Sequence, residues 1–176
     1  MALARPPQSA THDLPARQFA RLAQPMHLRR GGVIEQPVVA YESWGQLTAT
    51  RDNAVLLFTG LSPSAHAASS PADPKPGWWE SMIGAGRPID TNRYFVVCVN
   101  SLGSPFGSSG PSSTDPRTGR PYGINFPEIT VEDIATAGHE VVRSFGIERV
   151  AAVVGPSLGG MTVLAYCALF PGEAES

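Results

Sequence analysis

Continuous apolar runs mark the buried strands that this sequence predicts. Three runs, at residues 54–58, 94–99 and 150–154, have almost no polar interruption. Such runs are typical of strands in a parallel sheet, where both faces are covered. A further strand is predicted at residues 37–44, where Gly45 ends the stretch.

Two segments have the spacing of helices. In residues 130–145 apolar side chains recur at helical intervals, and Thr130 with Asp133 forms a capping-box-like pattern at the start. The second segment, residues 161–170, is apolar and stops before Pro171. Because strands alternate with helices, we predict an α/β fold with a mostly parallel sheet and crossover helices.

The other segments predict one folded domain behind a tail. Residues 1–29 are polar, rich in Pro and Ala and without periodicity, so we expect a flexible N-terminal extension. Residues 30–176 contain no linker and no internal repeat, which indicates a single domain. Two long loops interrupt it, at about residues 62–92 and 100–127. Loops of this length in a compact domain are usually functional.

A Gly-x-Ser-x-Gly motif, Gly155-Pro-Ser157-Leu-Gly159, lies between the last apolar run and the second helix. A tight strand-to-helix turn of this kind holds the serine in a strained backbone conformation and lifts its hydroxyl above the strand ends. The helix N-terminus beside it favours developing negative charge. We therefore identify Ser157 as a catalytic nucleophile and expect an α/β-hydrolase fold.

Acyl transfer at such a serine needs two N–H donors for the oxyanion. The first candidate is the backbone N–H of Leu158, the residue after the nucleophile. The second normally comes from a loop after an earlier strand. Here that loop follows residues 54–58, and the backbone N–H of Leu61 is our candidate.

The sequence contains no base in the expected place. A serine is a weak nucleophile until a base takes its proton, and in this fold an Asp or Glu and then a His follow the serine. All four histidines precede Ser157, namely His12, His27, His66 and His139. We call the Ser157 turn the nucleophile elbow. We therefore expect the N-terminal part of a longer enzyme, truncated after the helix that follows this elbow, with the acid and base beyond residue 176. Alone it should have a bare sheet edge and little or no activity.

Several blocks of sequence follow one another in the order of a known family. They are residues 41–45, 77–80, 89–95, 100–103, 107–113, 119–123, 126–127, 129–133 and 157–161. Together these blocks resemble the homoserine O-acetyltransferase family of acyl-CoA-dependent transferases. The resemblance implies a ping-pong reaction in which Ser157 takes an acyl group from acyl-CoA and passes it to the hydroxyl of homoserine or serine. It also implies acyl-CoA as a substrate with no bound cofactor, small-molecule partners and a homodimer at full length.

One loop departs from the acetyltransferase pattern. Residues 59–66 read Thr-Gly-Leu-Ser-Pro-Ser-Ala-His, where acetyltransferase members commonly read His-Ala-Leu-Thr-Gly. This version resembles the serine O-succinyltransferase branch. Because the loop follows the expected oxyanion donor, Ser62, Ser64 and His66 are candidate substrate-binding residues, and for His66 a packing role is the alternative. We favour a succinyl donor and a serine acceptor, with homoserine O-acetyl transfer close behind.

Composition and charge argue against several other classes. The formal net charge is −2, which gives no basic surface for nucleic acid. No apolar run reaches the ~18 residues that cross a bilayer, and we recognise no secretion signal, so we expect a cytoplasmic protein without a membrane partner. Cys98 and Cys167 lie in apolar runs and are expected to be reduced core thiols, and no metal-site spacing is present.

Two other functions stay open. A plain esterase would use the same elbow with water as the acceptor, and the chemistry up to Ser157 does not separate it from a transferase. Alternatively, these residues form an inert or partner-binding module. For such a module the bare sheet edge predicts self-association or poor solubility.

Overall fold

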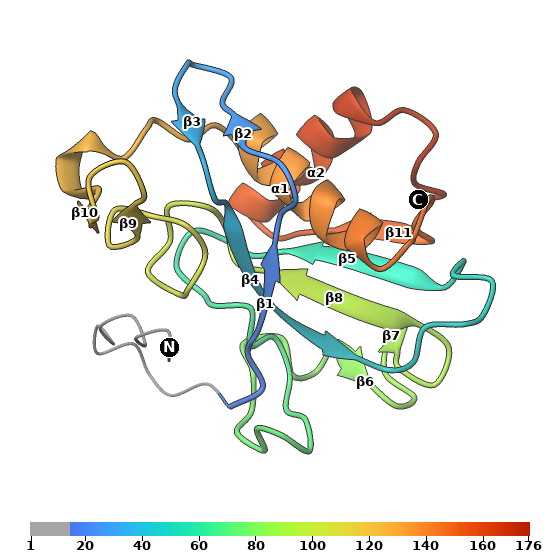
Figure 1. The fold of residues 1–176 in the computed structure, drawn as a ribbon. Coiled ribbons are helices and arrows are strands. Elements are labelled where there is room, and N and C mark those ends of the chain that lie inside the picture. Colours follow the sequence, from blue (N-terminus) through green and yellow to red (C-terminus); the bar gives the residue numbers. More distant parts are fainter. Residues whose placement is uncertain (1–14) are drawn as a thin grey trace.

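The computed structural model describes residues 15–176, which form a mixed five-stranded sheet with two helices on one face (Figure 1). Strand β4 is antiparallel to β1 and β8, whereas β5 is parallel to both β8 and β11. The expected α/β architecture is confirmed, and its parallel half leads to Ser157. In the order of the sheet, the strands are β1 (Gln18–Arg21), β4 (Val38–Trp44), β8 (Phe95–Val99), β5 (Ala54–Phe58) and β11 (Ala152–Val154).

Short strands and one short helix lie in the connections between these strands. Three two-stranded ribbons form within the described residues, and one turn of 3₁₀ helix follows the last of them. The short elements are β2 (Met26–His27) with β3 (Val33–Ile34), β6 (Ile83–Gly84) with β7 (Ile89–Asp90), β9 (Thr114–Asp115) with β10 (Arg120–Pro121), and η1 (Gly123–Asn125).

Helix α1 (Val131–Ser144) begins at the predicted capping box. The Thr130 backbone N–H donates to Asp133 Oδ2 at 2.8 Å, and the Asp133 N–H donates to Thr130 Oγ1 at 3.3 Å. The helix lies so close to β5 that a Cβ at Gly138 would be 2.4 Å from the Phe58 ring. A glycine inside a helix weakens it, and here the close helix–strand approach accounts for that residue.

A long loop, not a helix, covers the opposite face of the sheet. Its buried alanines and the side chains of Trp78 and Trp79 pack against the apolar side chains of β5 and β8. The two indole rings stack at 5.3 Å between centroids. Gly77 lets the loop fold on itself, since a Cβ there would lie 2.1 Å from the carbonyl carbon of Ala67. The length of this loop therefore serves to complete the core.

Glu80 ties this loop together and makes its stability depend on pH. Its carboxylate accepts hydrogen bonds from the N–H groups of Ser69 and Gly77 at 2.7 and 3.0 Å and pairs with Arg87 at 2.9 Å. The two backbone N–H groups lead the contacts that lower the pKa of Glu80 from 4.5 to about 2. A lowered folded-state pKa gives stability that is present above pH ~4.5 and is lost as the pH falls towards 2.

We expect Glu80→Gln to lower the denaturant midpoint at neutral pH and to match the unsubstituted protein near pH 2. Urea unfolding between pH 2 and 7 would measure this, with the exposed glutamate variant Glu148→Gln as control. If the difference in urea midpoint between Glu80→Gln and the unsubstituted protein is the same at every pH from 2 to 7, the role of the carboxylate is contradicted.

The structure corrects the expected N-terminal boundary. A flexible extension is expected over residues 1–29, yet within it Gln18–Arg21 forms β1 and pairs with β4 from Gln18↔Tyr41 to Arg21↔Val38. Met26 and Leu28 are buried in the core beside the helices. Main-chain pairing and these two anchors hold the segment, which has no apolar period to reveal it. Residues 1–14, the rest of that expected extension, lie outside the described part of the chain.

The structure also changes three smaller expectations. Helix α2 (Leu158–Leu169) begins at Leu158, three residues earlier than predicted. The edge of β11 is not bare, because Val153 N–H donates to Ser176 O at 3.0 Å and Val150 N–H donates to Glu173 O at 2.9 Å. Cys98 is buried as expected, but Cys167 is exposed.

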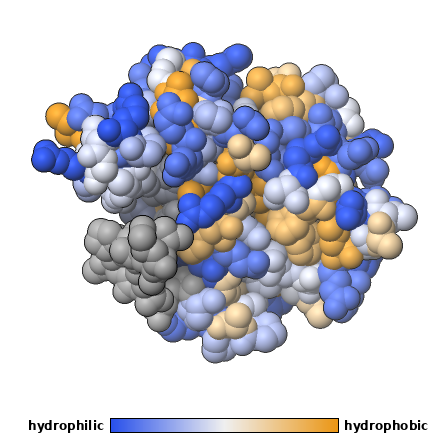
Figure 2. All heavy atoms as spheres, viewed as in Figure 1, coloured by the Kyte–Doolittle hydropathy of each residue, from blue (hydrophilic) through white to orange (hydrophobic). Residues whose placement is uncertain are grey.

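Apolar side chains do reach the surface on α2. Met161 and Leu164 are 55% and 72% exposed. Figure 2 shows a mostly polar face on which apolar residues gather near the end of α2. An apolar helix that is solvated on one side presents a surface that favours self-association.

Candidate active site

The strand-to-helix turn places Ser157 at the N-terminal end of α2 with an unusual backbone. Its φ is 54° and its ψ is −120°, and Arg51 is the only other non-glycine residue among residues 15–176 with a positive φ. Such conformations cost about 1–3 kcal/mol and persist where the surroundings impose them, often at active sites. The Ser157 side chain belongs to an exposed residue, so its hydroxyl is accessible. This geometry is the one that the Gly-x-Ser-x-Gly motif predicts.

The two motif glycines are required by close contacts. A Cβ at Gly155 would lie 2.5 Å from the carbonyl carbon and oxygen of Gly159. A Cβ at Gly159 would lie 2.5 Å from the carbonyl oxygen of Phe58. The first contact closes the turn on itself, and the second sets the first turn of α2 against the end of β5. Together they hold Ser157 above the sheet.

We expect Gly159→Ala to cost about 1–3 kcal/mol, because the added methyl forces α2 away from β5. The turn should also relax, so acylation of Ser157 should fall together with the melting temperature. Cys167→Ala, which adds no atom and changes an exposed position of the same helix, is the control. Calorimetry and an acylation assay measure the two effects, and a Gly159→Ala protein as stable as the control would contradict the packing argument.

The structure brings the two expected oxyanion donors to one hollow. Leu61 and Leu158 both line a cavity of about 380 Å³, together with residues 101–105 and 129–131 and Ile134. Neither the Leu61 nor the Leu158 backbone N–H donates a hydrogen bond to a residue within 15–176. Two free donors beside an exposed serine suit an anion that forms during acyl transfer.

The other expected binding residues do not gather at this hollow. Ser62 is exposed. Ser64 accepts a hydrogen bond on its backbone oxygen from Trp78 Nε1 at 2.8 Å. The ring of His66 points to Glu42, with Nδ1 2.9 Å from Oε2, and its Nε2 lies 2.8 Å from the backbone oxygen of Lys75. These contacts favour the packing role for His66 over contact with a ligand.

Glu42 and His66 form a buried pair on the loop-covered face of the sheet. Their side chains are 1% and 9% exposed. Burial raises the pKa of Glu42 against the opposing effect of His66. Burial alone would lower the pKa of His66, but its hydrogen bonds to Glu42 and to Lys75 O outweigh that, so the pKa is raised. Since Lys75 O can only accept, Nε2 carries a proton, and a second proton is shared between Nδ1 and Glu42.

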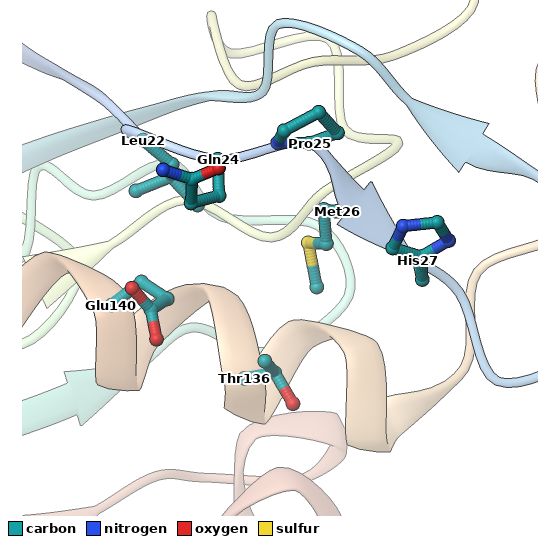
Figure 3. Close-up of a pocket in the computed structure, with 7 residues that line it drawn as sticks. All are labelled: Leu22, Gln24, Pro25, Met26, His27, Thr136 and Glu140. Atoms are coloured by element: carbon teal, nitrogen blue, oxygen red, sulfur yellow. The ribbon is translucent and has the colours of Figure 1, made fainter.

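The remaining described histidines lie apart from the elbow. His139 stacks on Phe170 at 3.8 Å between ring centroids, and its Nε2 is 2.9 Å from Glu173 Oε2, so it packs and bonds between α1 and the end of the chain segment after α2. His27 lies beside a hollow between β2 and α1 (Figure 3), lined by Leu22, Gln24, Pro25, Met26, His27, Thr136 and Glu140. None of these residues belongs to the elbow or to residues 59–66. His12 lies outside the described residues.

Sequence reasoning missed one polar residue at this end of the sheet. Asn100 follows β8 directly and is 2% exposed. Its Oδ1 accepts from the Ala65 N–H at 2.6 Å, and its Nδ2 donates to Phe106 O at 3.0 Å. A polar residue at the end of a buried strand was the signal available in the sequence, but its partner Ala65 is 35 residues away.

Residues 15–176 show no metal-binding group and no spanning helix. No set of three or more His, Cys, Asp or Glu side chains in this range is arranged to hold a metal ion. No helix in the same range is long and apolar enough to cross a membrane.

Known proteins resemble this chain closely. A serine O-succinyltransferase from Litchfieldella anticariensis is 57% identical over 157 residues, which are 89% of this chain and 43% of that protein. An L-serine/homoserine O-acetyltransferase from Streptomyces lavendulae is 57% identical over 92% of this chain and 43% of its own length. The chain thus spans less than half the length of these relatives.

Solved structures agree on the fold. Esterase E22 and the homoserine O-acetyltransferase from Bacillus anthracis are each 34% identical, with a TM-score of 0.82 over 90% of this chain and 45% and 44% of theirs. The family model of the alpha/beta hydrolase fold matches residues 53–174, well over half of the chain. That range holds β5, β8, β11, both helices and the Ser157 turn, and the chain belongs to the α/β-hydrolase fold family.

Proposed function

We propose that these residues form the N-terminal part of an acyl-CoA-dependent O-acyltransferase that acylates the hydroxyl of L-serine or L-homoserine. The observation that carries the proposal is the exposed Ser157, held at a strained turn directly before Leu158, which lines one cavity with Leu61. Within residues 15–176 neither the Leu61 nor the Leu158 N–H donates a hydrogen bond. The relatives named above, at 57% identity, supply the reaction class.

The proposed reaction has two halves with Ser157 in both. In the first, Ser157 Oγ attacks the thioester carbonyl carbon, a base takes the serine proton, the C–S bond breaks and the thiolate leaves as CoA thiol with that proton. In the second, the acceptor hydroxyl attacks the acyl-enzyme ester and gives up its proton, the bond to Ser157 breaks and Oγ regains a proton. The Leu61 and Leu158 N–H groups stabilise the oxyanion in each half. The acid and base are expected beyond residue 176.

Within this class we favour succinyl transfer to serine. Residues 59–66, which resemble the succinyltransferase branch, run from the end of β5 through Leu61, the residue of this segment that lines the cavity. Acetyl transfer to serine or homoserine is the second candidate, because a relative with that name is equally identical. Steady-state rates with succinyl-CoA and acetyl-CoA, each with both acceptors, separate the two.

An esterase is the alternative from a different class, because esterase E22 matches the fold as well as the acetyltransferase does. The deciding assay follows CoA release from acyl-CoA with and without serine or homoserine. A transferase releases CoA at the full rate only when an acceptor is present. Release at the full rate without an acceptor would favour the hydrolase and contradict the proposal.

We also propose a homodimer at full length, a cytoplasmic location, and small molecules as the only substrates. No bound cofactor is needed in this scheme, because acyl-CoA is consumed as a substrate. Sedimentation of the full-length protein tests the dimer, and a monomer at micromolar concentration would contradict it.

A further inference from the structure

Leu61 lies on a short backbone arch, residues 59–63, that has no hydrogen bonds of its own to hold it. No backbone group of the arch bonds to another residue in the described chain, and the one side-chain contact is Thr59 Oγ1 at 3.5 Å from Ser101 Oγ. Thr59 and Gly60 are buried, but Leu61 is 78% exposed, so packing holds the start of the arch and not Leu61 itself. The direction of the Leu61 N–H is therefore set by the two ends of the arch.

The first end is the last residue of β5. Phe58 pairs with Val99 of β8. Gly159 of the elbow packs against the carbonyl oxygen of Phe58. This end is thus shared with the turn that carries Ser157. It fixes where the arch starts but not the course it takes through Leu61.

The second end is a cluster of side-chain contacts on residues 64–66. Trp78 Nε1 donates to Ser64 O at 2.8 Å, and the buried pair with Glu42 holds the His66 ring. Between them, Asn100 Oδ1 accepts from the Ala65 N–H at 2.6 Å, the shortest of these contacts. Asn100 directly follows β8, the strand that pairs with β5, so it connects this end of the arch to the sheet.

Asn100 is itself held on several sides. Its Nδ2 donates to Phe106 O at 3.0 Å, its backbone N–H donates to Ala40 O at 2.8 Å, and its backbone oxygen accepts from Ser108 Oγ at 2.8 Å. An amide group with both ends bonded to backbone has little freedom to reorient. It therefore transmits the position of β8 and of the 101–106 loop to Ala65, four residues from the Leu61 donor.

We propose that Asn100 is a positioning residue that fixes the direction of the Leu61 N–H for the oxyanion. This inference rests on the proposed function. Oxyanion donors act only when they are aimed at the position of the developing charge, so a loosened arch weakens that hydrogen bond without removing any atom that touches substrate.

The test compares Asn100→Ala with Asn53→Ala in the full-length protein. Asn53 is a matched control, because its side chain also bridges backbone groups, accepting from Thr48 N–H and donating to Gln46 O and Arg93 O. It lies at the opposite end of β5 from the arch. Both variants should lose thermal stability. Only Asn100→Ala should lower the single-turnover rate of acyl-enzyme formation, by about 10- to 100-fold, which is less than the full loss of an oxyanion donor.

A spectroscopic readout separates positioning from destabilisation. Infrared difference spectra of the acyl-enzyme, with ¹³C in the acyl carbonyl, report how strongly that carbonyl is hydrogen-bonded. We expect the band to move to higher wavenumber in Asn100→Ala and to stay in place in Asn53→Ala. Asn100→Asp keeps an acceptor for the Ala65 N–H and should restore part of both the rate and the band position.

The outcomes distinguish this inference from the proposed function. If the unsubstituted protein forms no adduct on Ser157, the proposed function fails and this inference fails with it. If the adduct forms but Asn100→Ala leaves the band and the rate equal to those of Asn53→Ala, only the positioning role is overturned. If Asn100→Ala does not fold, Asn100→Ser takes its place, because a serine hydroxyl is too short to reach both Ala65 and Phe106. The acylation rate and the infrared band are then measured on that variant.

Discussion

Ser157→Ala in the full-length protein is expected to abolish the acyl adduct and to lower acyl transfer by at least ~10⁴-fold, the scale seen when a serine nucleophile is removed from other enzymes. The reason is that the elbow presents the exposed Ser157 directly before Leu158, whose N–H, like that of Leu61, donates no hydrogen bond within residues 15–176. Mass spectrometry after incubation with acyl-CoA measures the adduct, and CoA release measures the rate.

Ser101→Ala is the control for this experiment, because Ser101 lies on the wall of the same hollow as Leu61 and Leu158. We expect that variant to keep the adduct. An adduct that persists in Ser157→Ala would identify another nucleophile. Loss of the adduct in both variants would indicate that the hollow as a whole, and not the elbow hydroxyl, controls acylation.

Glu42→Ala is expected to lower stability by about 3–5 kcal/mol, the usual cost of removing one partner from a buried ion pair. In this fold His66 would keep a proton on Nε2 for Lys75 O but lose the carboxylate that shares the proton at Nδ1. At about 2–4 °C per kcal/mol for a domain of this size, the melting temperature should fall by roughly 10 °C.

A double-mutant cycle tests whether the loss belongs to the pair. Glu42→Gln, His66→Gln and the combined variant should show a coupling free energy near or above ~1 kcal/mol, because contacting residues in one network are not additive. Glu140→Ala, which removes an exposed glutamate of α1, is the control and should stay within about 0.5 kcal/mol. Additive effects within the cycle would show that Glu42 and His66 contribute separately.

The main strands and the elbow could be predicted because local sequence controls them. The runs at residues 54–58 and 94–99 coincide with β5 and nearly with β8, since a strand covered on both faces must be apolar throughout. The Thr130–Asp133 capping box also formed as predicted, because its partners are three residues apart. The motif glycines likewise meet atoms of their own turn or of the strand next to it.

Contacts between distant residues could not be predicted. Strand β1 was missed because three of its four residues are exposed, so no apolar pattern marks it, and its partner β4 begins only at Val38. The partner of His66 is 24 residues away, and the Ala65–Asn100 contact spans 35 residues. No periodic pattern or motif in the sequence indicates either of these two contacts.

The sequence by itself determined the α/β class, the strand–turn–helix unit around Ser157 and the candidate donors, because these depend on apolar periodicity and on steric limits within a few residues. Only the tertiary structure decided that Leu61 and Leu158 share one cavity, that His66 is a buried partner of Glu42, and that Asn100 bonds to Ala65. The physical reason is that each of these depends on which strands lie side by side and on which buried polar groups are left to satisfy one another.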